Sequence, residues 1–169
     1  MAAVLIGYLG TAFLVLSFQC KKERTLFLCQ TLSGLCFVIH YGLNGDLTGM
    51  AMDGICFVRA LLMYSGKKVM TGKGMLIGLC TVIVLLCVLT WEGFFSVFPT
   101  VALLVSTVFL YTGNGSKIRK AQFFVTSPSW MVYNIHVLSV PGIICEALDM
   151  LSVVVYAVRS KANKSKVED

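Results

Sequence analysis

The stretch MLIGLCTVIVLLCVLTW, residues 75–91, contains no charged residue and decides the fold class. A helix of this length and apolarity can cross the hydrocarbon core of a bilayer. Lys73 lies just before the stretch and Glu92 directly after it, so charged residues flank it on both sides. We therefore predict a membrane-spanning helix here.

The rest of the chain resembles this stretch in composition. Of its 169 residues, 57% are hydrophobic and 13% are charged, and the mean hydropathy is +0.85; soluble domains are about one quarter charged. Seven spans of roughly 20 residues use about 140 positions and leave no room for a soluble catalytic domain. We expect an all-α integral membrane protein, with six spans as the alternative count. The predicted helices are 2–19, 25–43, 49–65, 75–91, 96–112, 121–139 and 142–158.

The basic residues predict the orientation of these helices. Thirteen of the fourteen fall on alternate connections or the C-terminal segment, whereas the opposite connections contain Asp46 and Glu92 and no lysine or arginine. The basic groups are Lys21, Lys22 and Arg24; Lys67, Lys68 and Lys73; Lys117, Arg119 and Lys120; and Arg159, Lys161, Lys164 and Lys166. The positive-inside rule then places the N-terminus outside and the C-terminus in the cytoplasm. We expect the net charge of +6 to favour anionic lipid headgroups over nucleic acid as partners.

An internal repeat appears when the chain is aligned with itself at an offset of 96. The alignment pairs Lys21 with Lys117, Ser33 with Ser129, His40 with His136, and Asp53 with Asp149. We expect a three-helix unit in residues 1–66, a linker helix with its loops in 67–95, a second three-helix unit in 96–160 and a cytoplasmic tail in 161–169. Parallel repeats of this kind enclose a midplane substrate site in SWEET transporters. A duplicated bundle without transport activity is the alternative.

Ionisable residues inside the spans are the candidate functional groups, because such residues avoid lipid and line the bundle interior. They are His40, Asp53, Arg59, His136, Glu146 and Asp149. Trp130 and Asn134 lie four residues apart, so on a helix they share a face on which an aromatic ring and an amide could hold a small polar solute. We predict a substrate-binding role for Trp130, Asn134, Glu146, Arg59 and His40.

Coupling or gating roles are assigned to a second set of residues: Asp149, Asp53, His136 and Pro128. Pro128 is expected to kink its helix and free a carbonyl group. Alternatives remain open for several residues. Glu146 could form an internal ion pair with Arg59, and both histidines could serve at the membrane interface instead of in proton coupling. Asp53 could be solvated.

Motifs of other chemistries are missing from the sequence. It has no Walker loop, no HEXXH motif and no residues spaced for zinc or haem. The seven cysteines include no CXXC pair and read as small apolar residues. We therefore expect no enzyme activity, no catalytic residue, no metal and no cofactor.

The chain resembles a known family, most specifically in its second half. The resemblance rests on Phe98-Pro99-Thr100, Val105-Ser106-Thr107, Arg119, Trp130 with Asn134, Gly142 to Glu146, and Arg159. These residues are similar to those of bacterial inner-membrane proteins of the YgjV type, which are grouped with the SWEET, PQ-loop and PnuC-like transporters. The resemblance covers nearly the whole chain and implies a three-plus-one-plus-three helix fold and small-solute transport. The Pro-Gln pair of PQ-loop proteins is absent, since Cys29 precedes Gln30.

These features together predict a multi-pass protein of the bacterial inner membrane that moves a small polar solute by alternating access between two repeats. The alternative function is a non-transporting membrane scaffold or sensor. Because one chain holds both repeats, either a monomer or a homo-oligomer is compatible with the prediction.

Overall fold

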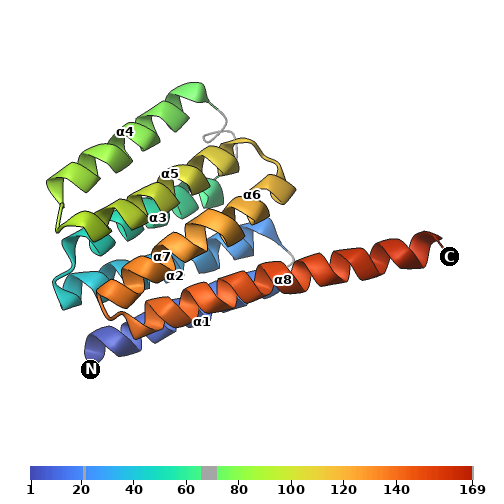
Figure 1. The fold of residues 1–169 in the computed structure, drawn as a ribbon, viewed down its shortest axis with the longest axis horizontal. Coiled ribbons are helices and arrows are strands. Elements are labelled where there is room, and N and C mark those ends of the chain that lie inside the picture. Colours follow the sequence, from blue (N-terminus) through green and yellow to red (C-terminus); the bar gives the residue numbers. More distant parts are fainter. Residues whose placement is uncertain (21, 66–71, 169) are drawn as a thin grey trace.

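The computed structural model describes residues 1–20, 22–65 and 72–168. Lys21, Lys67 and Lys68 of the predicted basic connections lie outside these ranges, as does the expected boundary between residues 66 and 67. The described part is helical throughout apart from short connections (Figure 1). Its elements are α1 (Ala2–Gln19), α2 (Glu23–Asn44), α3 (Leu47–Ser65), α4 (Lys73–Leu89), the 3₁₀ turn η2 (Phe94–Ser96), α5 (Val97–Tyr111), α6 (Gly115–Ala121), the π-helical segment η3 (Gln122–Thr126), α7 (Ser127–His136) and α8 (Val140–Glu168).

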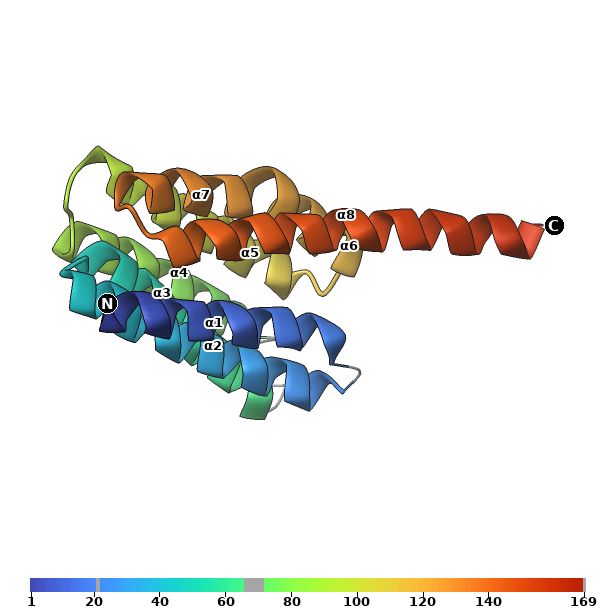
Figure 2. The ribbon, with the colours of Figure 1, turned by 90° about the horizontal axis from the view of Figure 1, so that it is seen from below.

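Seven helices are formed by the described residues when α6, η3 and α7, which follow one another without a gap, are taken as one. This agrees with the predicted number. The sixth helix begins at Gly115, earlier than the predicted residue 121, because the Asn114 side chain accepts hydrogen bonds from the N–H groups of Ser116 and Lys117 and caps it. It ends at His136, before the predicted residue 139, and Leu138 then takes a left-handed conformation with φ of 55°. The last helix is longer than predicted, because the residues expected as a tail continue α8 and project beyond the bundle (Figure 2).

The outer surfaces of these helices are suited to lipid. Within the described ranges, four helices are long and apolar enough to cross a membrane, Arg24–Asn44, Leu47–Ser65, Phe94–Tyr111 and Val140–Val158, and two shorter apolar helices are Ala2–Ser17 and Lys73–Leu89. Large apolar side chains are exposed along α4, with Val88 at 68% and Leu89 at 79% exposure. Such a continuous apolar surface indicates contact with a membrane.

The helices enclose an interior between two groups of neighbours. Helix α2 packs between α1 and α3, and α7 packs between α5 and α8, while α1 contacts α8 and α3 contacts α4 and α5. Gly7 allows α1 to approach α8 closely, because a Cβ atom there would lie 2.7 Å from Pro141 Cβ. The Thr11 hydroxyl donates a hydrogen bond of 3.2 Å to the Pro141 carbonyl across the same contact.

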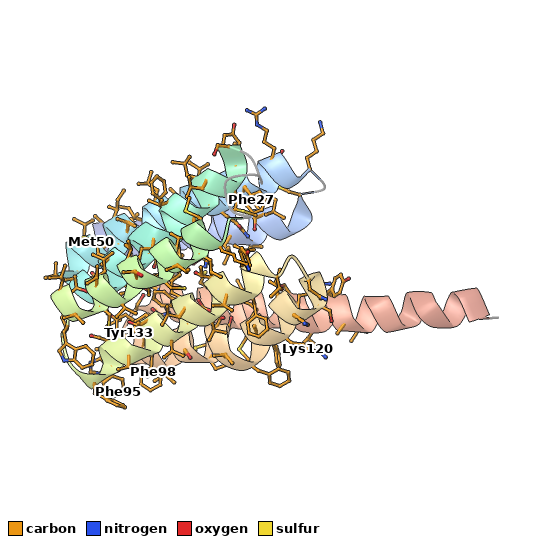
Figure 3. The ribbon with its side chains drawn as sticks, turned by 90° about the horizontal axis from the view of Figure 1, so that it is seen from above. Phe27, Met50, Phe95, Phe98, Lys120 and Tyr133 are labelled. Atoms are coloured by element: carbon orange, nitrogen blue, oxygen red, sulfur yellow. The ribbon has the colours of Figure 1, made fainter. Side chains whose placement is uncertain are left out.

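Two ends of the bundle are distinguished by charge. We call the end with Lys22, Arg24, Lys117, Arg119 and Lys120 the basic end, and the end with Asp46 and Glu92 the acidic end. Figure 2 shows α1 lying beside α8 near the N-terminus of α1, at the acidic end, and diverging from it toward the basic end. Figure 3 shows Tyr133 and Phe98 near the acidic end, and Phe27 and Lys120 toward the basic end.

Candidate solute-binding cavity

A cavity of about 830 Å³ lies between the two groups of helices. Its lining extends from Tyr41 and Asn134, toward the acidic end, to Phe27 and Arg119 at the basic end. Six residues predicted from the sequence as functional line it: Asp53, Arg59, Trp130, Asn134, Glu146 and Asp149. These six residues belong to α3, α7 and α8. Both the first half of the chain, which contains α1–α3, and the second half, which contains α5–α8, thus contribute to the lining.

The carboxyl groups of α8 have different hydrogen-bond environments. Glu146 and Asp149 share a helix face because they are three residues apart. The Asp149 carboxylate accepts hydrogen bonds from the Gln122 amide and from the Ser127 hydroxyl, the latter 3.2 Å long. By contrast, Glu146 Oε2 is buried and has no hydrogen-bond partner among the described residues. These two carboxyl groups of α8 therefore differ: among the described residues Asp149 has two hydrogen-bond donors, whereas Glu146 Oε2 has none.

The Arg59 guanidinium connects α3 with α5. Its Nη1 donates to Ser106 Oγ at 2.8 Å and to Thr107 Oγ1 at 2.9 Å. Both acceptors are neutral hydroxyl groups. The hydrogen bonds of Arg59 therefore hold the two halves of the chain together and are not directed to Glu146.

An aromatic and amide cluster bounds the cavity toward the acidic end. The Tyr41 hydroxyl donates a hydrogen bond of 2.6 Å to Asn134 Oδ1, and the Tyr41 ring stacks on the Trp130 ring with centroids 6.4 Å apart. Tyr41, Trp130 and Asn134 are all buried. Since Tyr41 belongs to α2 and the other two to α7, this cluster joins the halves and stops the cavity short of the acidic end.

A second connection between the halves lies at the acidic end itself. The Tyr133 hydroxyl of α7 donates to the Asp46 carboxylate in the α2–α3 connection. Asp46 Oδ1 also accepts a hydrogen bond of 2.8 Å from the Gly49 N–H and so caps α3. Burial raises the pKa of the Asp46 carboxyl above its usual value and the charge of Glu92 adds to this, although the hydrogen bonds from Tyr133 and Gly49 oppose the shift.

Glu92 lies beside Asp46 and also caps α3. Its carboxylate accepts hydrogen bonds from the N–H groups of Leu47, at 3.3 Å, and Thr48, at 3.1 Å. Burial opposes its ionisation, but these hydrogen bonds outweigh burial and hold the pKa of Glu92 below its usual value. A carboxylate is stabilised at a helix N-terminus, because the unpaired N–H groups there carry partial positive charge. We call the hydrogen bonds of Tyr41 and Tyr133 with their partners, together with the capped start of α3, the acidic-end closure.

Three predicted residues, His40, His136 and Pro128, do not line the cavity. His40 is buried at the α1–α8 contact, where Nδ1 donates to the Ala3 carbonyl at 2.7 Å, so that in a neutral ring Nε2 accepts from Ser139 Oγ at 2.9 Å. His136 is exposed and stacks on Phe95, with centroids 3.9 Å apart.

Pro128 lies at the start of α7, directly after the π-helical segment η3. A proline ring clashes with the carbonyl four residues earlier, so the helix cannot keep its regular hydrogen bonds here. The wider segment brings Gln122 and Ser127 to Asp149, and π-helical segments are frequent at functional sites. Pro128 therefore acts through the shape of the helix and not as a cavity-lining residue.

Several residues of the candidate site were not predicted from the sequence. Gln122 and Thr126 line the cavity from η3, and Ser106 lines it from α5. Gln122 and Ser106 have partners in other helices, the Asp149 carboxylate and the Arg59 guanidinium. The apolar residues around them do not indicate which partner each one meets. The available signal is that a polar side chain on an otherwise apolar helix indicates an interior position.

Comparison with known proteins identifies the family. No curated protein and no solved structure matches the chain. The model of the Imp-YgjV family, described as a bacterial inner membrane protein, matches residues 1–164. This match covers every helix around the cavity, and it agrees with the apolar surfaces of the bundle. The chain therefore belongs to the Imp-YgjV family of bacterial inner membrane proteins.

Proposed function

We propose that this protein is a transporter of a small polar solute that works by alternating access. The observation that carries the proposal is a cavity built from both halves of the chain, which places polar and charged side chains within an otherwise apolar lining. Hydrogen bonds close it toward the acidic end, and it extends to the basic end. Trp130 and Asn134 would contact the solute, and Glu146 would bind it or couple its movement. Arg59 would position α3 against α5.

The proposed mechanism is a rocking motion of two three-helix repeats. In a SWEET-like arrangement, α1–α3 form the first repeat, α4 is the linker, and α5, the α6–α7 helix and α8 form the second. The lining of the cavity by Asp53 and Asp149, which are equivalent at the offset of 96, supports this arrangement. Opening the acidic-end closure while the basic end closes would move the solute across the membrane.

The orientation in this proposal follows the positive-inside rule. The basic end would then lie in the cytoplasm, and the structure would correspond to an inward-facing state. A monomer would contain a complete path.

A test of alternating access needs no known substrate. Cys56 lines the cavity from α3, whereas Cys80 on α4 does not, so two variants are made in which each is the sole cysteine. We expect a membrane-impermeant thiol reagent to label Cys56 from either face of sealed vesicles. Labelling from the acidic end should rise at least threefold in Tyr41→Phe/Tyr133→Phe, because two hydrogen bonds of the closure are removed. Cys80 labelling should not change.

The opposing result is equally specific. Labelling of Cys56 from one face alone, in both the parent and the double variant, would mean that the bundle does not alternate, and a scaffold or sensor role would replace transport. A thermal-shift screen of sugars, nucleosides, vitamins, amino acids and polyamines complements this test. A stabilising solute should lose its effect in Glu146→Gln and Asn134→Ala but keep it in Glu92→Gln, since Glu92 does not line the cavity.

A further inference from the structure

Acidic side chains outnumber basic ones in the lining of the cavity. Three carboxylates line it, those of Asp53, Glu146 and Asp149. Of the two guanidinium groups in the lining, Arg119 packs over the Tyr156 ring at the basic end, 3.8 Å from its centroid. Arg59 is the other, and Ser106 and Thr107 accept its hydrogen bonds. The carboxyl groups of the lining therefore outnumber its guanidinium groups, and Glu146 is hydrogen-bonded neither to Arg59 nor to Arg119.

Two buried oxygen atoms of the lining have no hydrogen-bond partner among the described residues. They are Oε2 of Glu146 and Oγ1 of Thr126, and Thr126 as a whole is only 5% exposed. An unpartnered polar atom in an apolar bundle is costly, because it has lost water without gaining a hydrogen bond. Both atoms can accept a hydrogen bond, so a solute that carries N–H donors would satisfy them.

The aromatic wall of the cavity favours the same kind of solute. The Trp130 and Tyr41 rings are stacked, and both residues belong to the lining. The face of an aromatic ring attracts a cation, and tryptophan does so most strongly. Carboxylates together with aromatic rings form a site that attracts positive charge, whereas a sulfonate or phosphate would be repelled by the carboxylates and would gain nothing from the rings.

We infer that the cavity selects a small organic cation, whose protonated amine would lie between Glu146 and the Trp130–Tyr41 wall. This inference rests on the proposed transport function and names its substrate class. Such a cation would compensate the Glu146 carboxylate, whose Oε2 has no hydrogen-bond donor among the described residues; a paired charge is the usual requirement at membrane depth. A neutral solute would leave that charge uncompensated.

The test measures the charge preference of the cavity directly with three thiol reagents of similar size. They are the ammonioethyl, trimethylammonioethyl and sulfonatoethyl methanethiosulfonates, and they react with the sole-cysteine Cys56 protein in detergent. Each rate is divided by the rate with a small free thiol in water. We expect both cationic reagents to exceed the anionic one at least tenfold at Cys56, and all three to be similar at Cys80.

Charge-neutralising variants locate the origin of this preference. Glu146→Gln and Asp53→Asn should each lower the cation-to-anion ratio about fivefold, because one unit charge roughly 8 Å away in water changes each rate by a factor of about 2.4 in opposite directions. Glu92→Gln removes a carboxylate outside the cavity and should leave the ratio unchanged. Unaltered elution in size-exclusion chromatography will show that each variant is folded, as will unaltered Cys80 labelling when the same substitution is made in the sole-cysteine Cys80 protein.

The outcomes separate this inference from the proposed function. Labelling of Cys56 from both faces of vesicles, with the anionic reagent favoured or no preference, would retain transport and overturn the cation selectivity. A ratio that does not respond to Glu146→Gln or Asp53→Asn would also overturn it. Labelling from one face alone would instead refute transport, whichever reagent reacts faster.

Discussion

Gly142 is the position at which a single methyl group should disturb the closed end of the cavity most directly. A Cβ atom built there would lie 2.3 Å from Asn134 Oδ1 and 2.5 Å from Asn134 Cγ, whereas ordinary contacts are 3.4–4 Å. Asn134 is only 1% exposed and is held by the Tyr41 hydroxyl, so it has no free space into which to move. Gly142→Ala must therefore displace Asn134 and weaken its hydrogen bond.

The size of the effect follows from three terms. Overpacking a buried site costs about 1–3 kcal/mol, and loss of the Tyr41–Asn134 hydrogen bond costs about 1 kcal/mol. Replacing glycine by alanine in a helix returns up to about 1 kcal/mol. We expect Gly142→Ala to lower the free energy of unfolding by about 1–3 kcal/mol, which corresponds to a fall in Tm of about 2–12 °C. Thermal unfolding of the purified protein in detergent measures it.

Two further variants identify the cause. Gly54→Ala is the matched control, because a Cβ atom at Gly54 has no atom within 4 Å, and it should not lower Tm. In an Asn134→Ala background the clash no longer exists, so the added cost of Gly142→Ala should vanish, as a double-mutant cycle will report. Equal Tm values for the two alanine variants, or an undiminished cost in the Asn134→Ala background, would refute the reasoning. If the contact also maintains the closure, Gly142→Ala will increase labelling of Cys56 from the acidic end.

Other predictions concern the acidic end, the π-helical segment and the orientation. The pKa of Asp46 is raised, so the folded state favours the protonated carboxyl group, and the contribution of Asp46 to stability is complete at low pH and is lost as pH rises. Asparagine carries no charge at any pH, so Asp46→Asn should raise Tm more at pH 7 than at pH 4. The pKa of Glu92 is lowered, so its contribution exists above its ordinary value and is lost as pH falls; Glu92→Gln should lower Tm at pH 7 and have little effect at pH 4. Gln122→Leu removes a donor to the Asp149 carboxylate and should lower stability by about 1–3 kcal/mol, and adding Asp149→Leu should recover most of it in thermal unfolding. Green fluorescent protein fused to the C-terminus should fluoresce, and alkaline phosphatase fused there should be inactive; the reverse pattern would contradict the predicted orientation.

Charged residues in apolar stretches were the most informative part of the sequence for the site. Asp53, Arg59, Glu146 and Asp149 had to avoid lipid, and the structure places all four around one cavity. The spacing of Trp130 and Asn134 was informative for the same reason, because a helix places residues four apart on one face. These predictions needed only the helical period and the cost of charge in hydrocarbon.

Contacts between helices could not be predicted in this way. Tyr41 is not among the predicted site residues, and Asp46 is predicted only as an acidic residue of a connection, yet both form hydrogen bonds with α7 across the bundle. The same limit applies to His40, whose equivalence with His136 at the offset of 96 suggested a shared role. The structure buries His40 at the α1–α8 contact and leaves His136 exposed, since the two positions meet different neighbours.

In the proposed repeat, the acidic-end closure depends on positions at which the two units differ. At the offset of 96, Tyr133 corresponds to Phe37, and Asp46 corresponds to Gly142. The pair Tyr133–Asp46 forms a hydrogen bond across the bundle, whereas Phe37 has no hydroxyl and Gly142 has no side chain. The missing side chain at Gly142 instead leaves the space that Asn134 occupies when it binds Tyr41. The first unit thus supplies Asp46, which accepts the hydrogen bond from Tyr133. The equivalent residue of the second unit, Gly142, leaves room for the hydrogen bond between Tyr41 and Asn134. Within the proposed repeat, this divergence makes the two halves complementary and gives the closed state a hydrogen-bonded connection that a symmetric pair of units would not form.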